Sequence, residues 1–543
     1  MTQFRVLVTD EVDPRGVELL RAEPSLDVNE QPTRPWQELR GEISEYDAFV
    51  GRSATRLPAE LLREARRLRV IGRAGVGTDN IDLSAATALG IAVINAPGGN
   101  TIAVAELFFG ALLSFLRHLP YAYESMRAGR WDRSDLLGTE LCGRTIGIVG
   151  LGRIGGEVAA RARAFGMTVV AYDPYIQRDR FELHRVERAE RLADLLARAN
   201  VLTVHTPLTD ETRGMIATEA LERLPRGAIV ANFARGGIID EPALAAALEA
   251  DHLAGALLDV YATEPLPADH PFRLASNVLL TPHLGASTVE GQRNVAVDVC
   301  IAVRDALLSG QLSGAVNLAA VDRARWSDLR GALYLARQEA AIARAMLAER
   351  GARVPEQLTV HFGPQFIGAD SLLGSAAAEG LLAAIVNNDR VNIVNARERA
   401  TERGIAIATV PLATTDDAQA VRVTVSGSGT QLTIGGTATP GAAPRITRIG
   451  EFKVDIAPRR TLIVLTNVDV PGVIGQVGTV LGSAGINIAE YHQARMTQGG
   501  EALAAISVDG TVSEQVRRRL LDVASVRSAT VVEGDRQDAD IFE

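Results

Sequence analysis

The sequence is poor in cysteine, lysine and aromatic residues. Its 543 residues include two cysteines, Cys142 and Cys300, a single lysine, Lys453, and 4% aromatic side chains. Two cysteines cannot build a disulfide framework, and neither lies in a spacing typical of metal ligands, so we expect no bound metal. Because nearly all the basic residues are arginines, any anion must be bound by guanidinium groups.

An excess of positive charge and long apolar runs are also missing. The formal net charge of −10 argues against a nucleic acid or an anionic membrane surface as the partner of the whole molecule. No apolar run is long enough to cross a membrane, and the N-terminal stretch MTQFRVLVTDEVDP contains no apolar signal-peptide core. We therefore expect a cytoplasmic protein kept in a reducing environment.

What the chain has instead is the length and pattern of a multidomain α/β protein. With 47% hydrophobic and 22% charged residues it resembles ordinary globular proteins, and it is too long for one core. Residues 4–95 alternate short apolar runs, such as FRVLVTD, with amphipathic segments, which is typical of a parallel sheet. One long apolar helix is expected over residues 100–119 and another over 290–311.

A second block of the same kind follows from residue 145. Apolar runs that end in polar, glycine or proline residues occur in TIGIVGLGRIG, MTVVAYDP, NVLTVHTPLT, GAIVANFARGG, LAGALLDVYATEP and NVLLTPHLG. Helical periodicity separates these runs. The pattern predicts a doubly wound parallel sheet whose functional loops lie at the carboxyl ends of the strands.

Beyond residue 317 the pattern changes to α+β. Helical segments up to about residue 349 and near 371–386 are followed by β-rich pieces with Gly, Ser and Thr turns. Residues 460–533 run in the order strand, helix, strand, strand, helix, strand, which is the ferredoxin-like split βαβ order. The last residues, EGDRQDADIFE, are acidic and are expected to be frayed.

A glycine-rich loop opens the second block. Gly150, Gly152 and Gly155 form GLGRIG between the apolar run TIGIV and the helical segment GEVAARARAFG, and Asp173 closes the next strand. Glycines allow backbone N–H groups to approach a pyrophosphate at a helix N-terminus, and the acid accepts hydrogen bonds from a ribose diol. Because the acid would repel a 2′-phosphate, NAD is favoured over NADP; an ordinary glycine turn is the alternative.

Three polar residues end neighbouring strands of the same block. Arg235 follows VANFA, Glu264 follows LDVYAT, and His283 follows LLTP. Each residue alone has an ordinary structural explanation, but together they supply what hydride transfer with a 2-hydroxy acid needs. His283 would exchange the hydroxyl proton, Glu264 would favour its imidazolium form, and Arg235 would bind the carboxylate.

The stretches GLGRIG, NFARGGIIDE, LDVYATEP and TPHLGAST resemble the D-isomer-specific 2-hydroxyacid dehydrogenase family. The resemblance covers roughly residues 3–316 and implies that Arg235, Glu264 and His283 are the catalytic triad. It further implies cofactor contacts at Gly150, Gly152, Arg153, Ile154, Gly155, Asp173, Thr206, Phe233, Ala234, Arg235, Asp259, His283, Leu284, Gly285 and Ala286.

The N-terminal lobe adds arginines that a small hydroxy acid does not need. Arg52 and Arg73 lie at strand ends there, and Arg133 precedes the second block. Guanidinium groups suit a phosphate, although a single arginine is more often a surface charge. These segments resemble family members that oxidise 3-phospho-D-glycerate, and the resemblance implies a substrate site made of Arg52, Ser53, Arg73, Gly75, Asn100, Arg133, Arg235 and His283.

Residues 460–533 resemble an ACT domain, a module that binds amino acids at dimer interfaces. The resemblance is carried by NVDVPG at the first strand–helix turn and by GINI. Asn467, Asp469 and Asn487 are the candidate residues for binding L-serine as an effector; a purely structural dimerisation module is the alternative. Residues 317–455 resemble, through VNIVNA (391–396), the intervening domain of long family members.

We therefore expect two Rossmann-like lobes followed by an α+β domain and a ferredoxin-like βαββαβ domain. The expected limits are 1–97 with 290–316 for the substrate lobe, 98–289 for the NAD-binding domain, 317–456 for the intervening domain, 459–534 for the ACT domain and 535–543 for a flexible tail.

The expected activity is NAD-dependent oxidation of 3-phospho-D-glycerate to 3-phosphooxypyruvate, the first step of serine synthesis, with L-serine as feedback inhibitor. Another D-2-hydroxyacid dehydrogenase, a 2-oxoglutarate reductase, or a non-enzymatic NAD-sensing protein are the alternatives. The resemblance implies a homotetramer, which the sequence pattern does not separate from a dimer.

Overall fold

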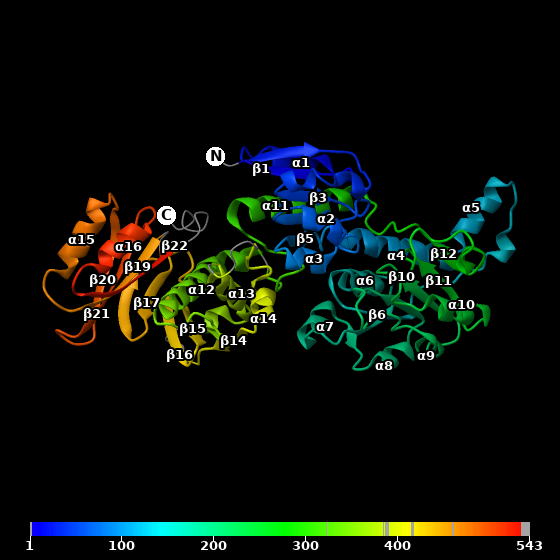
Figure 1. The fold of residues 1–543 in the computed structure, drawn as a ribbon. Coiled ribbons are helices and arrows are strands. Elements are labelled where there is room, and N and C mark those ends of the chain that lie inside the picture. The colour runs from blue at the N-terminus through cyan, green and yellow to red at the C-terminus, as the bar shows by residue number, and fades with distance from the viewer. Residues whose placement is uncertain are drawn as a thin grey trace. The chain divides into compact units, whose positions relative to one another are not determined.

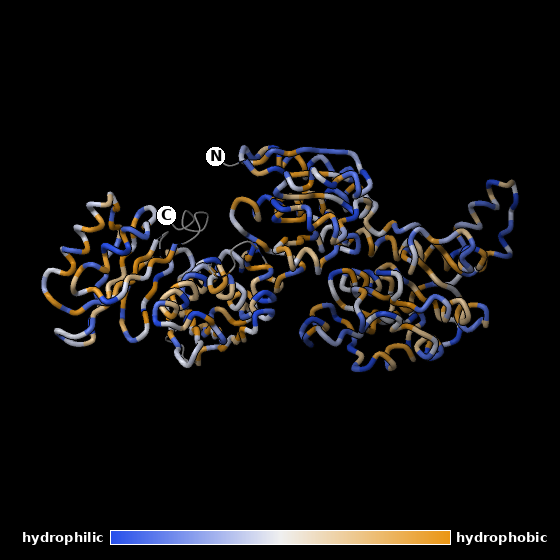
Figure 2. Tube along the Cα trace, viewed as in Figure 1, coloured by the Kyte–Doolittle hydropathy of each residue, from blue (hydrophilic) through white to orange (hydrophobic). Residues whose placement is uncertain are grey.

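The computed structural model describes residues 3–321, 323–383, 385, 390–413, 418–458 and 461–533. The chain divides into two compact units: Ala96–Asp298 form one, and Met1–Asn95 with Val299–Glu543 form the other. Hydrophobic segments gather in the interior of each part (Figure 2). The acidic tail expected over residues 535–543 lies outside the described residues.

The unit that contains the N-terminus begins with a five-stranded parallel sheet in the order β2-β1-β3-β4-β5 (Figure 1). Its strands are β1 (Phe4–Val8), β2 (Leu26–Glu30), β3 (Ala48–Gly51), β4 (Val70–Arg73) and β5 (Ala92–Asn95). Its helices are α1 (Pro14–Arg21), α2 (Ala59–Glu64) and α3 (Leu83–Ala88). Asp13 and Asp82 cap α1 and α3 with side chains that accept backbone N–H groups, which fixes where these helices begin.

The unit Ala96–Asp298 is built on a seven-stranded parallel sheet in the order β12-β11-β10-β9-β6-β7-β8. The strands are β6 (Thr145–Val149), β7 (Thr168–Tyr172), β8 (Glu187–Arg188), β9 (Val201–Val204), β10 (Ala228–Asn232), β11 (Leu253–Leu258) and β12 (Val278–Leu280). The chain runs from β6 to one side and returns through β9 on the other, so the topological switch point lies between β6 and β9. Ligands of such sheets bind outside the strand ends at this point.

The helices of this sheet bury one apolar layer on each of its faces. They are α4 (Thr101–Leu116), α6 (Arg153–Ala164), α7 (Arg178–His184), α8 (Leu192–Leu196), α9 (Thr218–Glu222) and α10 (Glu241–Glu249). The short helix α5 (Leu119–Arg127) is largely exposed, and α11 (Val289–Ser309) leads out of the unit. The apolar helix expected over residues 100–119 is confirmed as α4, which has Asn100 as its N-cap, but it ends at Leu116, three residues earlier than expected. A separate helix, α5, begins at Leu119, because His118 adopts the left-handed conformation with φ of 52° and Pro120 has no N–H to donate to the preceding turn.

A six-stranded mixed sheet follows in the order β14-β13-β15-β16-β17-β18. Its strands are β13 (Gln357–Phe362), β14 (Ala406–Pro411), β15 (Ala420–Gly427), β16 (Thr430–Thr437), β17 (Arg445–Ile449) and β18 (Phe452–Ile456). The helices α12 (Arg323–Glu349), α13 (Asp370–Leu382) and α14 (Ala396–Glu402) accompany it. α12 and α13 touch at Gly380, where a Cβ atom would lie 1.9 Å from the carbonyl oxygen of Arg337.

The C-terminal sheet is antiparallel, in the order β20-β21-β19-β22. Its elements are β19 (Thr461–Val468), α15 (Val473–Ser483), β20 (Ile488–Arg495), β21 (Glu501–Val508), α16 (Glu514–Leu521) and β22 (Val526–Glu533). The predicted βαββαβ order is confirmed, and with the two parallel sheets and the mixed sheet so is the predicted fold class.

The described residues form neither a single membrane-spanning helix nor a cluster of metal-binding side chains. No single helix there is both long and apolar enough to cross a membrane. No group of three or more His, Cys, Asp or Glu side chains among the described residues could hold a metal ion.

One ionisable side chain lies in the core between α12 and the mixed sheet. Glu339 is fully buried, and burial raises the pKa of its carboxyl group well above the ordinary value because it outweighs the attraction of Arg422. A carboxyl group of this kind holds a proton when folded that it releases on unfolding. The stability of the protein therefore falls as the pH rises above the ordinary glutamate pKa.

The change Glu339→Gln removes this linked proton. We expect the variant to melt about 2–4 °C higher than the parent at about pH 8, and the difference to shrink towards about pH 5. Thermal unfolding followed by circular dichroism measures the difference in melting temperature at each pH, with the exposed Glu398→Gln on α14 as control. Equal shifts at the two pH values would contradict the linkage.

Candidate active site

Three polar side chains follow three neighbouring strands of the seven-stranded sheet. Arg235 lies after β10, Glu264 in the loop after β11, and His283 after β12. β10 pairs with β11, and β11 with β12, in parallel. The three loops therefore leave the sheet at the carboxyl ends of its strands, where doubly wound sheets bind their ligands.

His283 and Glu264 form the central contact of this edge. Nδ1 of His283 donates a hydrogen bond of 2.7 Å to Oε2 of Glu264. The other carboxylate oxygen accepts the backbone N–H of Tyr261 at 3.1 Å. The carboxylate is thus held at both oxygens and orients the imidazole, which leaves Nε2 to exchange a proton with a ligand.

The loop that carries His283 is held by Asp259, a fully buried residue just after β11. Its carboxylate accepts the N–H groups of Leu284 and Gly285 at 2.7 and 2.9 Å and the hydroxyl of Thr281 at 2.6 Å. Burial raises the pKa of Asp259, and these donors oppose that shift because they favour the charged form. The held loop keeps His283 at φ of 55°, a conformation that non-glycine residues rarely adopt.

Sequence reasoning gave Asp259 only a cofactor contact implied by resemblance, and it missed this role. One feature of the sequence could have indicated it: Asp259 directly follows the apolar run LAGALL, and a carboxylate at the end of a buried strand is itself expected to be buried and to need hydrogen-bond donors. The donors that use it belong to residues 281–285, and a one-dimensional pattern does not connect them.

The loops after β10 and β11 approach each other at Gly236. A Cβ atom there would lie 1.8 Å from the carbonyl oxygen of Tyr261, so only glycine permits the contact. Asn232 closes the loop: its amide donates to the carbonyl of Arg235 at 2.8 Å and its oxygen accepts the N–H of Ala234 at 3.1 Å. The close approach places the loop of Arg235 against the segment that leads to Glu264.

The glycine-rich loop between β6 and α6 forms a cradle. Gly150 has φ of 92°, and Gly155 packs so closely that a Cβ atom would lie 2.1 Å from the carbonyl oxygen of Gly150. At Gly152, the N-cap of α6, a Cβ atom would point into open space, so the end of the helix is left clear. Arg153 and Ile154 begin the helix. This geometry fits a pyrophosphate bound by backbone N–H groups.

Asp173 stands after β7 beside this cradle. Its carboxylate accepts the N–H of Leu151 at 2.9 Å and that of Tyr175 at 3.0 Å, which ties the glycine loop to the end of β7. The hydroxyl oxygen of Thr206, in the loop after β9, is buried and has no hydrogen-bond partner within the described residues. An unsatisfied hydroxyl at the switch point is consistent with a ligand that completes its hydrogen bonding.

The remaining predicted cofactor residues line the same edge. Phe233 and Ala234 are buried after β10, and the ring of Phe233 meets that of Phe108 edge-on at 5.9 Å. Leu284 is exposed, whereas Gly285 is buried against Val104. Ala286, which follows them, is half-buried. The carboxyl ends of these strands thus carry both a loop that fits a dinucleotide and an oriented pair of acid and base side chains.

Family models match three parts of the chain. Residues 109–285 match the model of D-isomer specific 2-hydroxyacid dehydrogenase, NAD binding domain; residues 368–450 match the D-3-phosphoglycerate dehydrogenase intervening domain; and residues 461–525 match the ACT domain. The chain is also 37% identical to the D-3-phosphoglycerate dehydrogenase of Synechocystis sp. over 532 residues, which is 98% of this chain and 95% of that protein. The chain belongs to the D-isomer-specific 2-hydroxyacid dehydrogenase family.

A second full-length relative and two shorter proteins of known structure are also similar to this chain. The D-3-phosphoglycerate dehydrogenase of Bacillus subtilis is 36% identical over 98% of this chain and 99% of its own. A glyoxylate reductase from Paecilomyes thermophila (TM-score 0.54, 30% identity) covers 58% of this chain and 99% of its own. An NAD⁺-bound 3-phosphoglycerate dehydrogenase from Entamoeba histolytica (TM-score 0.50, 26% identity) covers 58% and 98%. The present family member is an NAD-dependent oxidoreductase.

In this dehydrogenase, Arg52 and Arg73 share the carboxyl edge of the five-stranded sheet. Arg52 and the exposed Ser53 follow β3, and Arg73 ends β4. The guanidinium of Arg73 packs directly on Gly75: a Cβ atom on this glycine would lie 1.4 Å from Nη1 of Arg73. Gly75 is therefore needed for the position of Arg73.

Two polar residues that the sequence reasoning missed hold the loop of Arg52. Asp10 accepts the N–H groups of Arg52 and Thr55, each at 2.9 Å. The amide of Asn80 donates to the carbonyls of the same two residues at 2.9 and 2.7 Å. The loop is thereby fixed before a substrate arrives.

The other two predicted substrate residues belong to the unit Ala96–Asp298. Asn100 is buried at the start of α4, and its side-chain oxygen accepts no hydrogen bond from a described residue. Arg133 is exposed in the short 3-10 helix Arg133–Asp135.

The predicted effector residues of the ACT domain have internal partners. Asp469 accepts the N–H of Gly499 and a hydrogen bond from Arg495, and these keep the pKa of its carboxyl group below the ordinary value. Asn487 is exposed and donates to Asp509 at 2.7 Å, whereas Asn467 is buried and bonds within the sheet. Asp469 and Asn487 are thus the accessible members of the predicted set.

The change Gly236→Ala tests how the active-site loops are held together. A Cβ atom forces the loop of Arg235 away from Tyr261, and a displacement of about 1 Å suffices to lower kcat/KM by about 10²-fold. NADH formation measures the loss, and fluorescence titration should show that NAD binding survives. Gly110→Ala in α4, where a Cβ atom meets nothing within 4 Å, is the matched control and should leave turnover unchanged.

Proposed function

We propose that this enzyme oxidises 3-phospho-D-glycerate with NAD⁺ to 3-phosphooxypyruvate, the first step of L-serine synthesis. The observation that carries the proposal is the His283–Glu264 pair, 2.7 Å apart, at the strand edge that also bears Arg235. The names of its full-length relatives support the same substrate. The domain limits expected from the sequence are part of this proposal.

The three residues divide the chemistry between them. Arg235 binds the substrate carboxylate through its guanidinium fork. Nε2 of His283 accepts the proton of the C2 hydroxyl, and Glu264 stabilises the imidazolium that results. NAD⁺, when bound, supplies the hydride acceptor, with Asp173 selecting the free ribose diol. C2 thereby becomes a carbonyl carbon, having lost one hydride and leaving one proton on His283.

Recognition of the far end of the substrate is assigned to Arg52, Arg73 and Arg133. Arg52 is held in place by the anchored loop after β3, and Arg73 by its packing on Gly75. Arginines placed in advance lose little side-chain entropy when they bind a phosphate, which favours a phosphorylated hydroxy acid over lactate or glycerate.

A substrate panel tests the proposal. We expect NADH formation with 3-phospho-D-glycerate to exceed that with D-glycerate or D-lactate by about 10²-fold or more in kcat/KM, since a phosphate adds charge-assisted hydrogen bonds. The reverse reaction is compared with 2-oxoglutarate. Preference for a non-phosphorylated acid would reassign the substrate, and absence of NADH formation with every acid would favour the reading as an NAD-sensing protein.

Variants separate catalysis from recognition in the same assay. His283→Ala should lower kcat by about 10²–10⁴ while NAD binding survives, because it removes the proton acceptor. Arg73→Gln should raise KM for 3-phospho-D-glycerate and leave the low activity on D-glycerate unchanged, whereas the exposed Arg66→Gln should alter neither. Near-normal turnover of His283→Ala would refute its role.

We also propose that L-serine inhibits the enzyme through the ACT domain, in a homotetramer or dimer. An ionised Asp469 at the turn after β19 can bind an ammonium group, and Asn487 can bind a carboxylate. Gly472 is the N-cap of α15, and the backbone N–H groups of the first turn of this helix suit a carboxylate as well.

Kinetics with added L-serine test this regulation. Millimolar L-serine should lower the rate, D-serine should have little effect, and Asp469→Ala should abolish the inhibition without changing the uninhibited rate. The exposed Asp522→Asn on the same domain is the matched control. A flat rate across millimolar L-serine would reject the proposal.

A further inference from the structure

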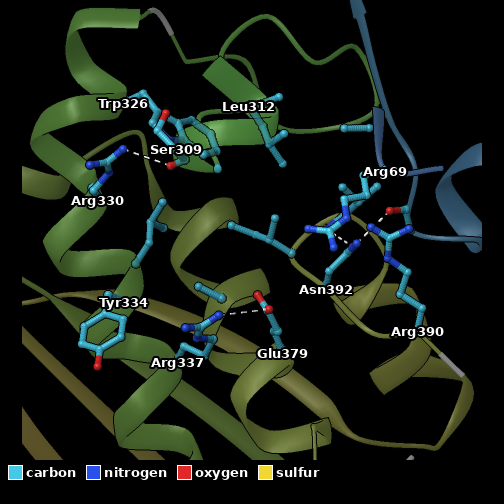
Figure 3. Close-up of a pocket in the computed structure, with 18 residues that line it drawn as sticks. Arg69, Ser309, Leu312, Trp326, Arg330, Tyr334, Arg337, Glu379, Arg390 and Asn392 are labelled. Atoms are coloured by element: carbon cyan, nitrogen blue, oxygen red, sulfur yellow. Dashed lines mark hydrogen bonds and ion pairs between the residues drawn. The ribbon is translucent and has the colours of Figure 1, made fainter. Parts of the chain in front are cut away.

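A cavity of about 230 Å³ lies between α12 and α13 on one side and the end of α11 with the start of β5 on the other (Figure 3). Its walls come from segments far apart in the sequence. Trp326, Leu312 and Leu333 supply apolar surface, and Ser309, Asn392 and Gly90 supply polar surface.

The charged lining of this cavity is strongly biased. Arg69, Arg330, Arg337 and Arg390 line it, and Glu379 is the one carboxylate among the described lining residues. Glu379 lies 3.4 Å from Arg337, on the same wall of the cavity in Figure 3. Within the described lining, one negative charge thus faces four positive ones.

Two of these arginines are held by neutral partners. Arg390 donates to the carbonyl of Leu68 at 2.6 Å, and Arg330 donates to the carbonyl of Ser309 at 3.0 Å. Neither forms an ion pair with a described residue. Burial and the nearby Arg69 lower the pKa of Arg390 to about 10, so the site is one where positive charges are crowded and poorly solvated. A carbonyl orients a guanidinium without neutralising it, which leaves its charge for an anion.

We propose that this cavity binds a small multivalent oxyanion that carries a phosphate or at least two carboxylate groups. Guanidinium groups from α12 and from the segments before β4 and α14 converge on it, and Trp326 offers a face for a short carbon chain. The bound anion bridges the substrate lobe to the intervening domain. Tyr334 connects the same wall to the ACT domain, because its hydroxyl donates to the carbonyl of Pro458 just before β19.

Trp326 reports on the cavity directly. The chain has three tryptophans, so Trp36→Phe with Trp131→Phe leaves Trp326 as the sole indole and makes the signal blind to anions bound elsewhere. In this full-length background, inorganic phosphate should change the emission in a saturable way that sodium chloride at equal ionic strength does not reproduce. Citrate in a second titration distinguishes a preference for phosphate from one for polycarboxylates.

The variant Arg330→Gln should weaken phosphate binding by about tenfold to a hundredfold, because one charge-assisted contact is lost. Arg330→Lys should retain most of the affinity, and Arg350→Gln, just beyond the end of α12 and exposed, should retain all of it. Ser309→Asp, which adds a negative charge to the wall, should abolish binding and serves as the test if Arg330→Gln does not fold. A response that chloride reproduces, or unchanged affinity in Ser309→Asp or in folded Arg330→Gln, overturns the proposal.

Discussion

The active site depends on the hydrogen bonds that the buried carboxylate of Asp259 makes with the loop after β12. It accepts the N–H groups of Leu284 and Gly285, and the buried N–H of Gly285 alone would cost about 1–3 kcal/mol if left unpaired. With these donors held, His283 is kept in a left-handed conformation and its imidazole meets Glu264 at 2.7 Å. The left-handed backbone of His283 is thus supported by the end of a neighbouring strand, and the residue proposed as general acid and base is fixed before any ligand binds.

Three glycines in the loops that carry the predicted site residues make contacts that a side chain would block. Gly236 lies against Tyr261, Gly155 against Gly150, and Gly75 against the guanidinium of Arg73. In each case a side chain on the glycine would separate a charged or hydrogen-bonding group from its position. The proposed catalytic and binding residues are therefore positioned by main-chain packing and by buried polar anchors such as Asp10 and Asn232.

The C-terminal half is connected to the substrate lobe by contacts that also rest on backbone carbonyls. Asn392 donates to Gly90, Asn395 to Ala88 and Arg390 to Leu68. The long helix α12 lies behind this contact, and its far end meets the ACT domain through Glu349, which binds Thr530 and Arg517. An amino acid bound to the ACT domain and an anion bound to the arginine-lined cavity would therefore act on one continuous helix.

The sequence by itself determined the order and type of most elements, the dinucleotide loop and the three strand-end residues, because periodicity, glycine turns and strand ends are local properties. It overestimated the helix over residues 100–119, where the left-handed His118 and the following Pro120 break the pattern. Only the tertiary structure decided that Asp259 holds the loop of His283, that Asp10 and Asn80 hold the loop of Arg52, and that Arg69, Arg330, Arg337 and Arg390 surround one cavity. These arrangements join residues tens to hundreds of positions apart, and which of them meet is set by the packing of whole elements, which local patterns do not encode.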